Sequence, residues 1–235
     1  MRRYFQLVLL LVTTIFWCAA TSTQAAELAD VVSTVEQGYQ QLTDLQATFK
    51  QKTTIAAIGR SEKGGGELLL RRAKGGAAQF RFDYTKPAQQ IVSDGKTLWY
   101  YVPEAKQVMV SDMATFFTGG NSLALTYLTG MGHLSRDFNA KSGGKDKQGN
   151  HLLELTPKKP SPVLAKLQLT VAAAAVDQFS ADKTARTPFP LLASVVTDGA
   201  GNRTEINYSN VKVNRGLSID RFKFKVPTGV AVVKQ

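Results

Sequence analysis

The sequence predicts an α+β protein in which a strongly curved antiparallel sheet carries helices on one side. Near the N-terminus, apolar residues repeat every three or four positions, which is the spacing of an amphipathic helix. Beyond that segment, short strand-like runs follow one another at intervals of about ten residues, separated by turn signals. No diagnostic repeat and no domain linker interrupts them. A two-sheet sandwich is the alternative arrangement of these strands.

Residues 1–25 have the pattern of a cleaved export signal. A short basic region precedes the almost wholly apolar stretch Leu7–Ala20, and small residues lead up to a cleavage point near Ala25. The apolar stretch is shorter than the roughly 20 residues that a membrane span requires. We therefore expect an exported protein without stable membrane insertion, whose residues 26–235 form a single domain.

The first element after the signal is predicted to be a long amphipathic helix over roughly residues 27–47. Steps of three or four residues separate its apolar side chains, which places them on one face of a helix. They are Leu28, Val31, Val32, Val35, Tyr39, Leu42, Leu45 and Phe49. Such a face must pack against another part of the molecule.

An antiparallel meander is predicted next, beginning after the glycines at 64–66 and ending near Ser111. In Gln79–Tyr84 the residues alternate, so Phe80, Phe82 and Tyr84 share one face of a strand. The Asp-Gly pair at 94–95 stands between two apolar runs and is a typical signal of a tight hairpin.

The middle of the chain differs from this pattern. Asp112–Phe117 and Ser122–Thr129 are short apolar segments with helical spacing, and glycines flank them. They predict a helical insert that rests on the sheet, because such short helices are unstable alone. Strands are then expected at Leu134–Lys141, Leu152–Thr156, Ala165–Val171, Val176–Ala181, Leu191–Thr197, Thr204–Val213 and Arg221–Val226.

Residues with catalytic or metal-binding chemistry form no recognisable constellation. His133 and His151 are the two imidazoles, Cys18 is the single cysteine, and none of them lies in a spacing that metal ligands use. No nucleophile elbow or paired-carboxylate spacing stands out. We therefore expect no metal, no cofactor and no enzymatic activity.

The formal net charge of +11 does not predict a nucleic-acid ligand, because the basic residues are scattered and the chain is expected to be exported. Arg221, Lys223 and Lys225 alternate with apolar residues in the last predicted strand and would share one face. This basic stripe is expected to dock a partner. A solvated basic face is the alternative.

Aromatic residues gather on the predicted strands and on the insert. Alternation of this kind occurs in any buried sheet, so the pattern alone favours a closed core.

Longer strings of residues say more than these periodicities. They are Leu45–Lys52, Gly66–Arg72, Val92–Tyr101, Leu153–Lys158, Asp198–Ile206 and Phe222–Val230. In this order they resemble the periplasmic outer-membrane lipoprotein carrier family, LolA. The Ser-Asp-Gly-Lys-Thr-Leu-Trp run and the Phe-x-Phe-x-x-Pro-x-Gly-Val ending are the most specific parts, whereas residues 171–190 match poorly.

The resemblance implies an incomplete β-barrel whose concave apolar face is covered by an N-terminal helix and a short helical lid. It also implies a monomeric periplasmic chaperone that binds the acyl chains of lipoproteins released from the inner membrane. Its partners would be acylated lipoproteins, an inner-membrane lipoprotein-releasing ABC transporter and an outer-membrane lipoprotein receptor. A periplasmic carrier or sensor of other lipids or glycolipids on the same scaffold is the alternative.

The resemblance further implies the residues of the site. Arg72 occupies the position of the arginine that latches the lid, with Arg71 as the nearest rival, although Ala73 stands where the family often has proline. The acyl-chain cavity would be lined by Leu70, Phe80, Phe82, Tyr84, Trp99, Tyr101, Val108, Val110, Phe116, Phe117, Leu123, Leu128, Leu169, Ile206, Tyr208 and Phe224.

Overall fold

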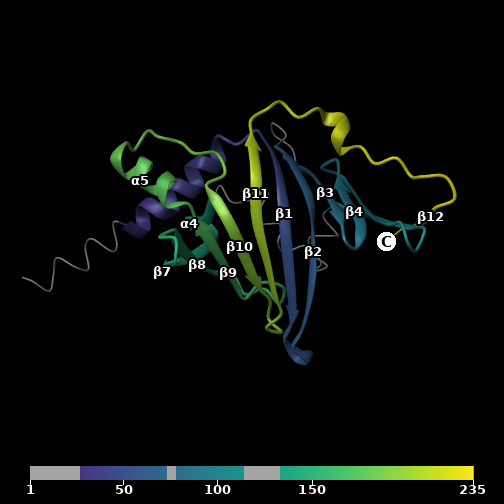
Figure 1. Ribbon diagram of the computed structural model, residues 1–235, viewed down its shortest axis with the longest axis horizontal. Coiled ribbons are helices and arrows are strands. Elements are labelled where there is room, and N and C mark those ends of the chain that lie inside the picture. The colour runs from purple at the N-terminus through teal and green to yellow at the C-terminus, as the bar shows by residue number, and fades with distance from the viewer. Residues whose placement is uncertain (1–26, 73–77, 114–132, 235) are drawn as a thin grey trace, which may run out of the picture.

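The computed structural model describes residues 27–72, 78–113 and 133–234, and within them one large curved sheet dominates (Figure 1). The strands are β1 (Asp44–Ile55), β2 (Arg60–Arg71), β3 (Gln79–Thr85), β4 (Ala88–Ser93), β5 (Thr97–Val102), β6 (Gln107–Asp112), β7 (Phe138–Lys145), β8 (His151–Pro157), β9 (Lys166–Val171), β10 (Leu191–Thr197), β11 (Arg203–Val213) and β12 (Ala231–Lys234). The helices are an N-terminal helix over residues 27–40, η1 (Ala56–Ile58), α4 (Leu134–Asp137), α5 (Ala173–Ala181) and η3 (Ile219–Phe222).

The twelve described strands lie in the order β12-β6-β5-β4-β3-β2-β1-β11-β10-β9-β8-β7. Every neighbouring pair is antiparallel except β12 and β6, which run parallel. The edge strands β12 and β7 do not pair with each other in this part of the chain, so the sheet stays open. The predicted α+β class and the unclosed, curved antiparallel sheet are confirmed, and a single sheet replaces the alternative of two.

The N-terminal helix is shorter than predicted, because it ends at residue 40 and β1 begins at Asp44. Leu45 and Phe49 are four residues apart, which fits a helix, but together with Ala47 they also fit the two-residue period of a strand. All three side chains are buried. Pairing of β1 with β2 on one side and β11 on the other decides in favour of the strand.

Two other predicted strands are wrong in part or entirely. Val176–Ala181 belongs to α5, whose first turn is three alanines, the residue with the highest helix propensity. Val176 and Phe179 of that helix are buried, at helical spacing. In Leu134–Lys141 the first turn is the helix α4, and the strand begins only at Phe138.

The C-terminal segment, residues 214–234, runs from the end of β11 past η3 to β12 (Figure 1). Its start is fixed by the buried carboxylate of Asp44, which accepts hydrogen bonds from the backbone N–H groups of Arg215 and Gly216 at 2.8 and 2.9 Å. The predicted strand Arg221–Val226 is wrong, because the chain forms η3 and then extends without pairing. The pairing occurs further on, where β12 lies against β6.

The predicted helical insert lies almost entirely outside the described residues, as does the predicted export signal. Of the insert's first segment, β6 includes Asp112. No helix in the described part of the chain is long and apolar enough to cross a membrane.

Candidate binding face under the N-terminal helix

The sheet has an inner face, defined here as the face that packs against the N-terminal helix. Strand register places apolar side chains of neighbouring strands in line on it. One such line runs Leu45, Leu70, Phe80, Ser93 and Leu98 across β1 to β5, and a second runs Ile206, Ser194, Leu169 and Leu153 across β11 to β8. All of these residues are buried. The inner face is therefore a largely apolar surface that crosses most of the sheet, with Ser93 and Ser194 as polar members of these lines.

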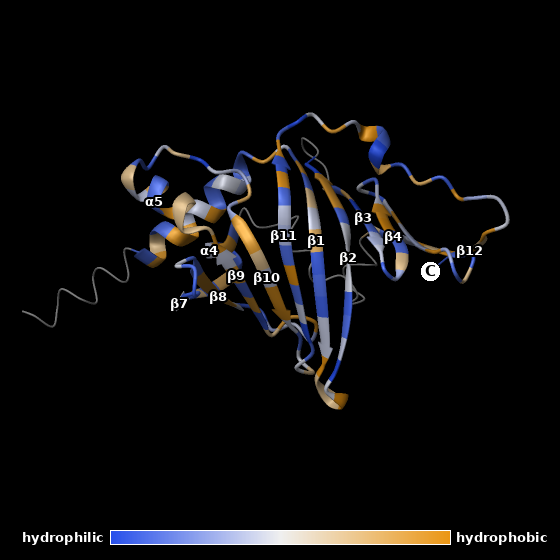
Figure 2. Ribbon diagram, in the orientation of Figure 1, coloured by the Kyte–Doolittle hydropathy of each residue, from blue (hydrophilic) through white to orange (hydrophobic). Residues whose placement is uncertain are grey.

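Hydropathy along individual strands follows this arrangement. In Figure 2, β11 carries alternating hydrophilic and hydrophobic residues, whereas β10 is largely hydrophobic. Alternation is the pattern of strands that face apolar surroundings on one side and water on the other.

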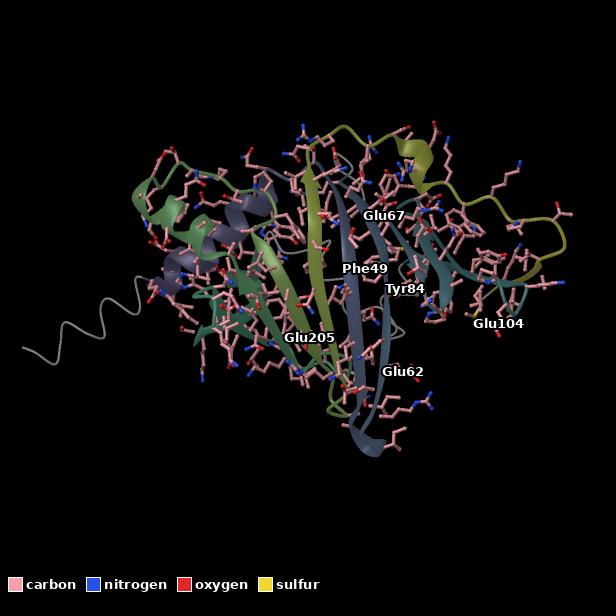
Figure 3. All side chains as sticks on the ribbon, viewed as in Figure 1. Phe49, Glu62, Glu67, Tyr84, Glu104 and Glu205 are labelled. Carbon is pink, nitrogen blue, oxygen red and sulfur yellow. The ribbon has the colours of Figure 1, made fainter. Side chains whose placement is uncertain are left out.

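An aromatic cluster lies at the centre of the inner face. The ring centroid of Phe49 is 5.3 Å from that of Phe82 and 4.9 Å from that of Tyr84, both in edge-on geometry (Figure 3 labels Phe49 and Tyr84). Phe49 and Tyr84 belong to β1 and β3, which are separated by β2, and Gly66 of β2 pairs with both residues. The missing side chain at Gly66 leaves room for the two rings to meet.

The N-terminal helix covers this face with its apolar stripe. Val31, Val35 and Tyr39 are buried in the same core cluster as the inner-face strands. Gly38 brings the helix close to the segment after α5, because a Cβ there would lie 2.3 Å from the carbonyl oxygen of Thr187. The predicted amphipathic packing is confirmed for this helix.

All three acidic residues of the helix hold it in place, and each contacts a different element. The Glu27 carboxylate lies 3.1 Å from Lys145 Nζ on β7, and Asp30 accepts hydrogen bonds from Ser180 and Lys183 at α5 and just beyond it. Glu36 accepts the backbone N–H of Ser135 in α4 at 2.7 Å. The hydrogen bond from Lys183, followed by that from Ser180, lowers the pKa of Asp30 below its ordinary value.

Arg72 contacts the C-terminal end of the helix. Its Nη1 donates a hydrogen bond to the carbonyl oxygen of Tyr39, and its backbone N–H donates to the carbonyl of Thr43 at 2.9 Å. Such a bond satisfies one of the carbonyls that every helix leaves without an internal partner. Arg71 instead donates to the side chain of Gln79 at 2.8 Å. Of the two candidates, Arg72 is therefore the one that bonds to a covering element, whereas the expected lid lies outside the described residues.

Four tyrosine hydroxyls interrupt the apolar surface of the inner face. Those of Tyr84, Tyr100 and Tyr208 bond to Gln51, Gln89 and Ser194 at 2.9, 2.8 and 2.8 Å. The hydroxyl of Tyr39 is buried and has no hydrogen-bond partner among the described residues. Burial raises the pKa of Tyr84 to about 12, and it also raises the pKa values of Tyr39 and Tyr208 well above the ordinary value of a tyrosine. The hydroxyls of these three residues therefore stay protonated at physiological pH.

The predicted cavity residues divide into three groups. Leu70, Phe80, Phe82, Tyr84, Leu169, Ile206 and Tyr208 lie together on the inner face. Phe116, Phe117, Leu123 and Leu128 lie outside the described residues. The expectation is wrong for Trp99, Tyr101, Val108, Val110 and Phe224, which lie on the outer face of the sheet or against it.

Strand alternation explains this correction. Leu98 points into the inner-face core, so Trp99 and Tyr101 on the same strand must point to the other side. The ring of Phe224 lies 6.2 Å from Trp99 and 5.7 Å from Tyr101, measured between centroids. These aromatics help to seat the C-terminal segment on the outer face and do not belong to the inner face.

The outer face under the C-terminal segment also has buried residues. Leu69, Val92 and Val108 from three strands and Phe222 from η3 are all completely inaccessible to solvent, and they lie outside the inner-face cluster. This group is called the outer cluster below.

Sequence reasoning missed several residues of the inner face. The helical spacing places Leu45 and Phe49 on the predicted helix instead of a strand, and the polar side chain of Ser194 carries no signal of burial. Tyr39 was expected on the helix face, but nothing in its spacing distinguishes its hydroxyl from any other.

The basic stripe of Arg221, Lys223 and Lys225 is exposed. Part of its charge is compensated, because Arg221 lies 3.5 Å from Glu67 and Lys223 lies 2.7 Å from Asp220. Across residues 27–72, 78–113 and 133–234, no group of three or more His, Cys, Asp or Glu side chains could hold a metal ion.

The fold and this face define an α+β protein whose open, curved sheet buries an apolar surface beneath a helix. The model of one protein family, described as outer membrane lipoprotein carrier protein LolA, matches residues 40–225. The chain therefore belongs to this family.

Two named relatives agree with that assignment, and one solved structure shows the same fold. An outer-membrane lipoprotein carrier protein of Chromobacterium violaceum is 34% identical over 191 residues, which is 80% of each chain. One of Azotobacter vinelandii is 28% identical over 193 residues, covering 81% of this chain and 82% of the other. A crystal structure of an uncharacterized conserved protein from Thermus thermophilus shares the fold, with a TM-score of 0.50 at 17% identity, over 88% of this chain and 98% of that one.

Proposed function

We propose that this protein is a periplasmic chaperone that binds the acyl chains of lipoproteins on its inner face. The observation that carries the proposal is the largely apolar surface from β5 across to β8, with one helix held over it. Membership of the family, and relatives that are named outer-membrane lipoprotein carrier proteins, support it.

The physical need for such a face follows from the cost of exposing acyl chains to water. At about 0.8 kcal/mol per buried CH₂, one sixteen-carbon chain carries roughly 12 kcal/mol of transfer free energy. A carrier must match much of this free energy with apolar contacts, and it must also release the chain to the next acceptor. We propose an inner-membrane lipoprotein-releasing ABC transporter as the donor and an outer-membrane receptor as the acceptor, with the basic stripe helping to dock a partner.

A capture experiment tests the carrier function. The purified protein is mixed with a lipoprotein in its acylated form and with the same protein lacking acyl chains, and complexes are isolated by pull-down. Capture of the acylated form alone is expected. Equal capture of both forms, or of neither, would refute the proposal, and recovery of a different lipid from the purified protein would favour a carrier or sensor of other lipids.

Arg72 is proposed to act as a latch that holds the covering elements closed over the inner face. In the described residues it bonds to the end of the N-terminal helix. We expect Arg72→Leu to fold but to take up and transfer acylated lipoprotein several times less efficiently. Loss of the Arg72 hydrogen bond would shift the equilibrium between the open and closed states. Arg71→Leu, whose wild-type contact is Gln79, is the matched control. Transfer by Arg72→Leu at the rate of the control would remove Arg72 from the mechanism.

A further inference from the structure

The hydroxyl of Tyr39 is a buried polar group that the described part of the chain leaves unsatisfied. The residue is 2% exposed, and within residues 27–72, 78–113 and 133–234 its Oη has no hydrogen-bond partner. Burying a hydroxyl without a partner costs free energy, so such groups are uncommon in native proteins. Tyr39 also belongs to the helix that covers the inner face, and its ring lies in the apolar core of that face. A partner supplied by a ligand would remove this cost.

A second hydroxyl group lies on the same side of the core. The ring of Phe189 contacts both tyrosines, with centroids 5.7 Å from Tyr39 and 5.2 Å from Tyr208. Tyr208 Oη and Ser194 Oγ form a buried hydrogen bond of 2.8 Å. Each hydroxyl carries one proton, so this pair uses one proton between its members and keeps the other available. Around Phe189, the core therefore offers two O–H donors, one from Tyr39 and one from the pair.

The chemistry of these donors selects a class of ligand. Burial raises the pKa values of both tyrosines, so they offer neutral hydrogen bonds and no charge. The surrounding side chains are apolar, and an ionised acceptor brought among them would lose its hydration. A neutral acceptor attached directly to a hydrocarbon chain fits both conditions, and an ester carbonyl of a glyceride is such a group.

We propose that Tyr39 Oη donates a hydrogen bond to an ester carbonyl of a diacylated ligand bound on the inner face, and that the Tyr208–Ser194 pair can serve the second ester. This inference rests on the proposed function, because it assumes that acyl chains bind there. It adds that the site recognises the linkage of the chains as well as their hydrocarbon.

Two lipids that differ only in the carbonyl groups test the inference. Dipalmitoylglycerol and the corresponding dihexadecyl diether are titrated separately against the protein with bound diphenylhexatriene, and displacement of this fluorescent hydrocarbon gives each affinity. We expect the wild type to bind the diester at least fivefold more tightly than the diether. Tyr39→Phe should lower this ratio towards one while leaving the affinity for the diether unchanged.

Tyr101→Phe is the matched control, because Tyr101 lies against Phe224 on the outer face, away from the proposed binding face. This variant should keep the preference for the diester. Tyr39→Phe should unfold at a urea concentration no lower than the wild type, since no partner loses a hydrogen bond.

The possible failures are distinguishable. A wild type that binds both lipids equally, or a ratio that Tyr39→Phe does not change, would overturn the ester inference alone. If neither lipid displaces the probe, the proposed function and the ester inference fall together.

Discussion

Gly66 shows how one missing side chain shapes the inner face. A Cβ at this position would lie 1.8 Å from the carbonyl oxygen of Asp83, far inside any allowed contact. Gly66 thus lets β2 and β3 approach closely at the place where the rings of Phe49 and Tyr84 meet across β2. Glycine inside a strand often marks such a close approach.

We expect Gly66→Ala to lower the free energy of unfolding by at least about 2 kcal/mol, because β2 and β3 must move apart to admit the methyl group. Urea unfolding followed by circular dichroism measures the loss. Gly64→Ala is the control in the same strand, since its Cβ would lie 3.3 Å from ring carbons of Tyr84 and 3.6 Å from the carbonyl oxygen of Lys86, without the severe overlap found at Gly66. Equal losses in the two variants would contradict this account.

The sequence could not reveal this role. Three consecutive glycines at 64–66 indicate a flexible connection before a sheet as readily as the interior of a strand, and the choice depends on contacts with residues far along the chain. The structure places all three inside β2, opposite Gln51, Lys50 and Phe49 of β1.

At the scale of elements, the N-terminal helix is attached to the rest of the molecule by polar contacts along its length. Glu27, Asp30 and Glu36 reach β7, the α5 region and α4, and the carbonyl of Tyr39 accepts from Arg72. The apolar stripe fixes the depth at which the helix packs, while these contacts fix its position along the sheet.

The Asp30 contact predicts a pH dependence of stability. The folded-state pKa of Asp30 is lowered from 3.8, so its contribution is present above that value and disappears as the pH falls through the folded-state pKa. Asp30→Asn should cost about 0.5 kcal/mol at neutral pH, a value typical of partly exposed pairs. The difference from wild type should shrink below pH 4.

Urea unfolding of wild type and Asp30→Asn at pH 7 and at pH 3 checks this expectation. Asp177→Asn, at an exposed position on α5, serves as the control. A difference between wild type and Asp30→Asn that is the same at both pH values would show that the carboxylate charge contributes nothing.

Elements could be predicted from the sequence where the apolar residues fit only one period. The prediction failed where they fit two. The alternation in Gln79–Tyr84 has a single interpretation, and the structure confirms the shared face of Phe80, Phe82 and Tyr84. The apolar residues Leu45, Ala47 and Phe49 fit the two-residue period of a strand, while the step of four from Leu45 to Phe49 also fits a helix. In residues 173–181 the sequence has little amphipathic pattern, and the propensity of alanine decides for a helix.

At the scale of the whole molecule, the chain covers both faces of its own sheet. The N-terminal helix covers the inner face, and the C-terminal segment contacts the outer face at Glu67, Trp99 and Tyr101 before it ends as β12. The sequence shows that Leu98 and Trp99 point to opposite sides of β5. It does not show which side faces the helix, because that depends on how distant segments pack.

Phe222 is the fully buried residue of η3 in the C-terminal segment, and its removal should be costly. We expect Phe222→Ala to lower the free energy of unfolding by about 3 kcal/mol, as is usual when a buried phenylalanine is truncated. Thermal unfolding followed by calorimetry measures it. Val226→Ala, in the same segment but 37% exposed, should cost less than about 1 kcal/mol. A small effect of Phe222→Ala would mean that the segment is only loosely attached.

The outer cluster also has a mechanical consequence. Because the C-terminal segment packs on the outer face, the strands beneath it should keep their curvature whatever binds on the inner face. Under the proposed function, room for bound acyl chains must then come from movement of the elements that cover the inner face. The free-energy cost of binding and release would fall on those elements and not on the sheet.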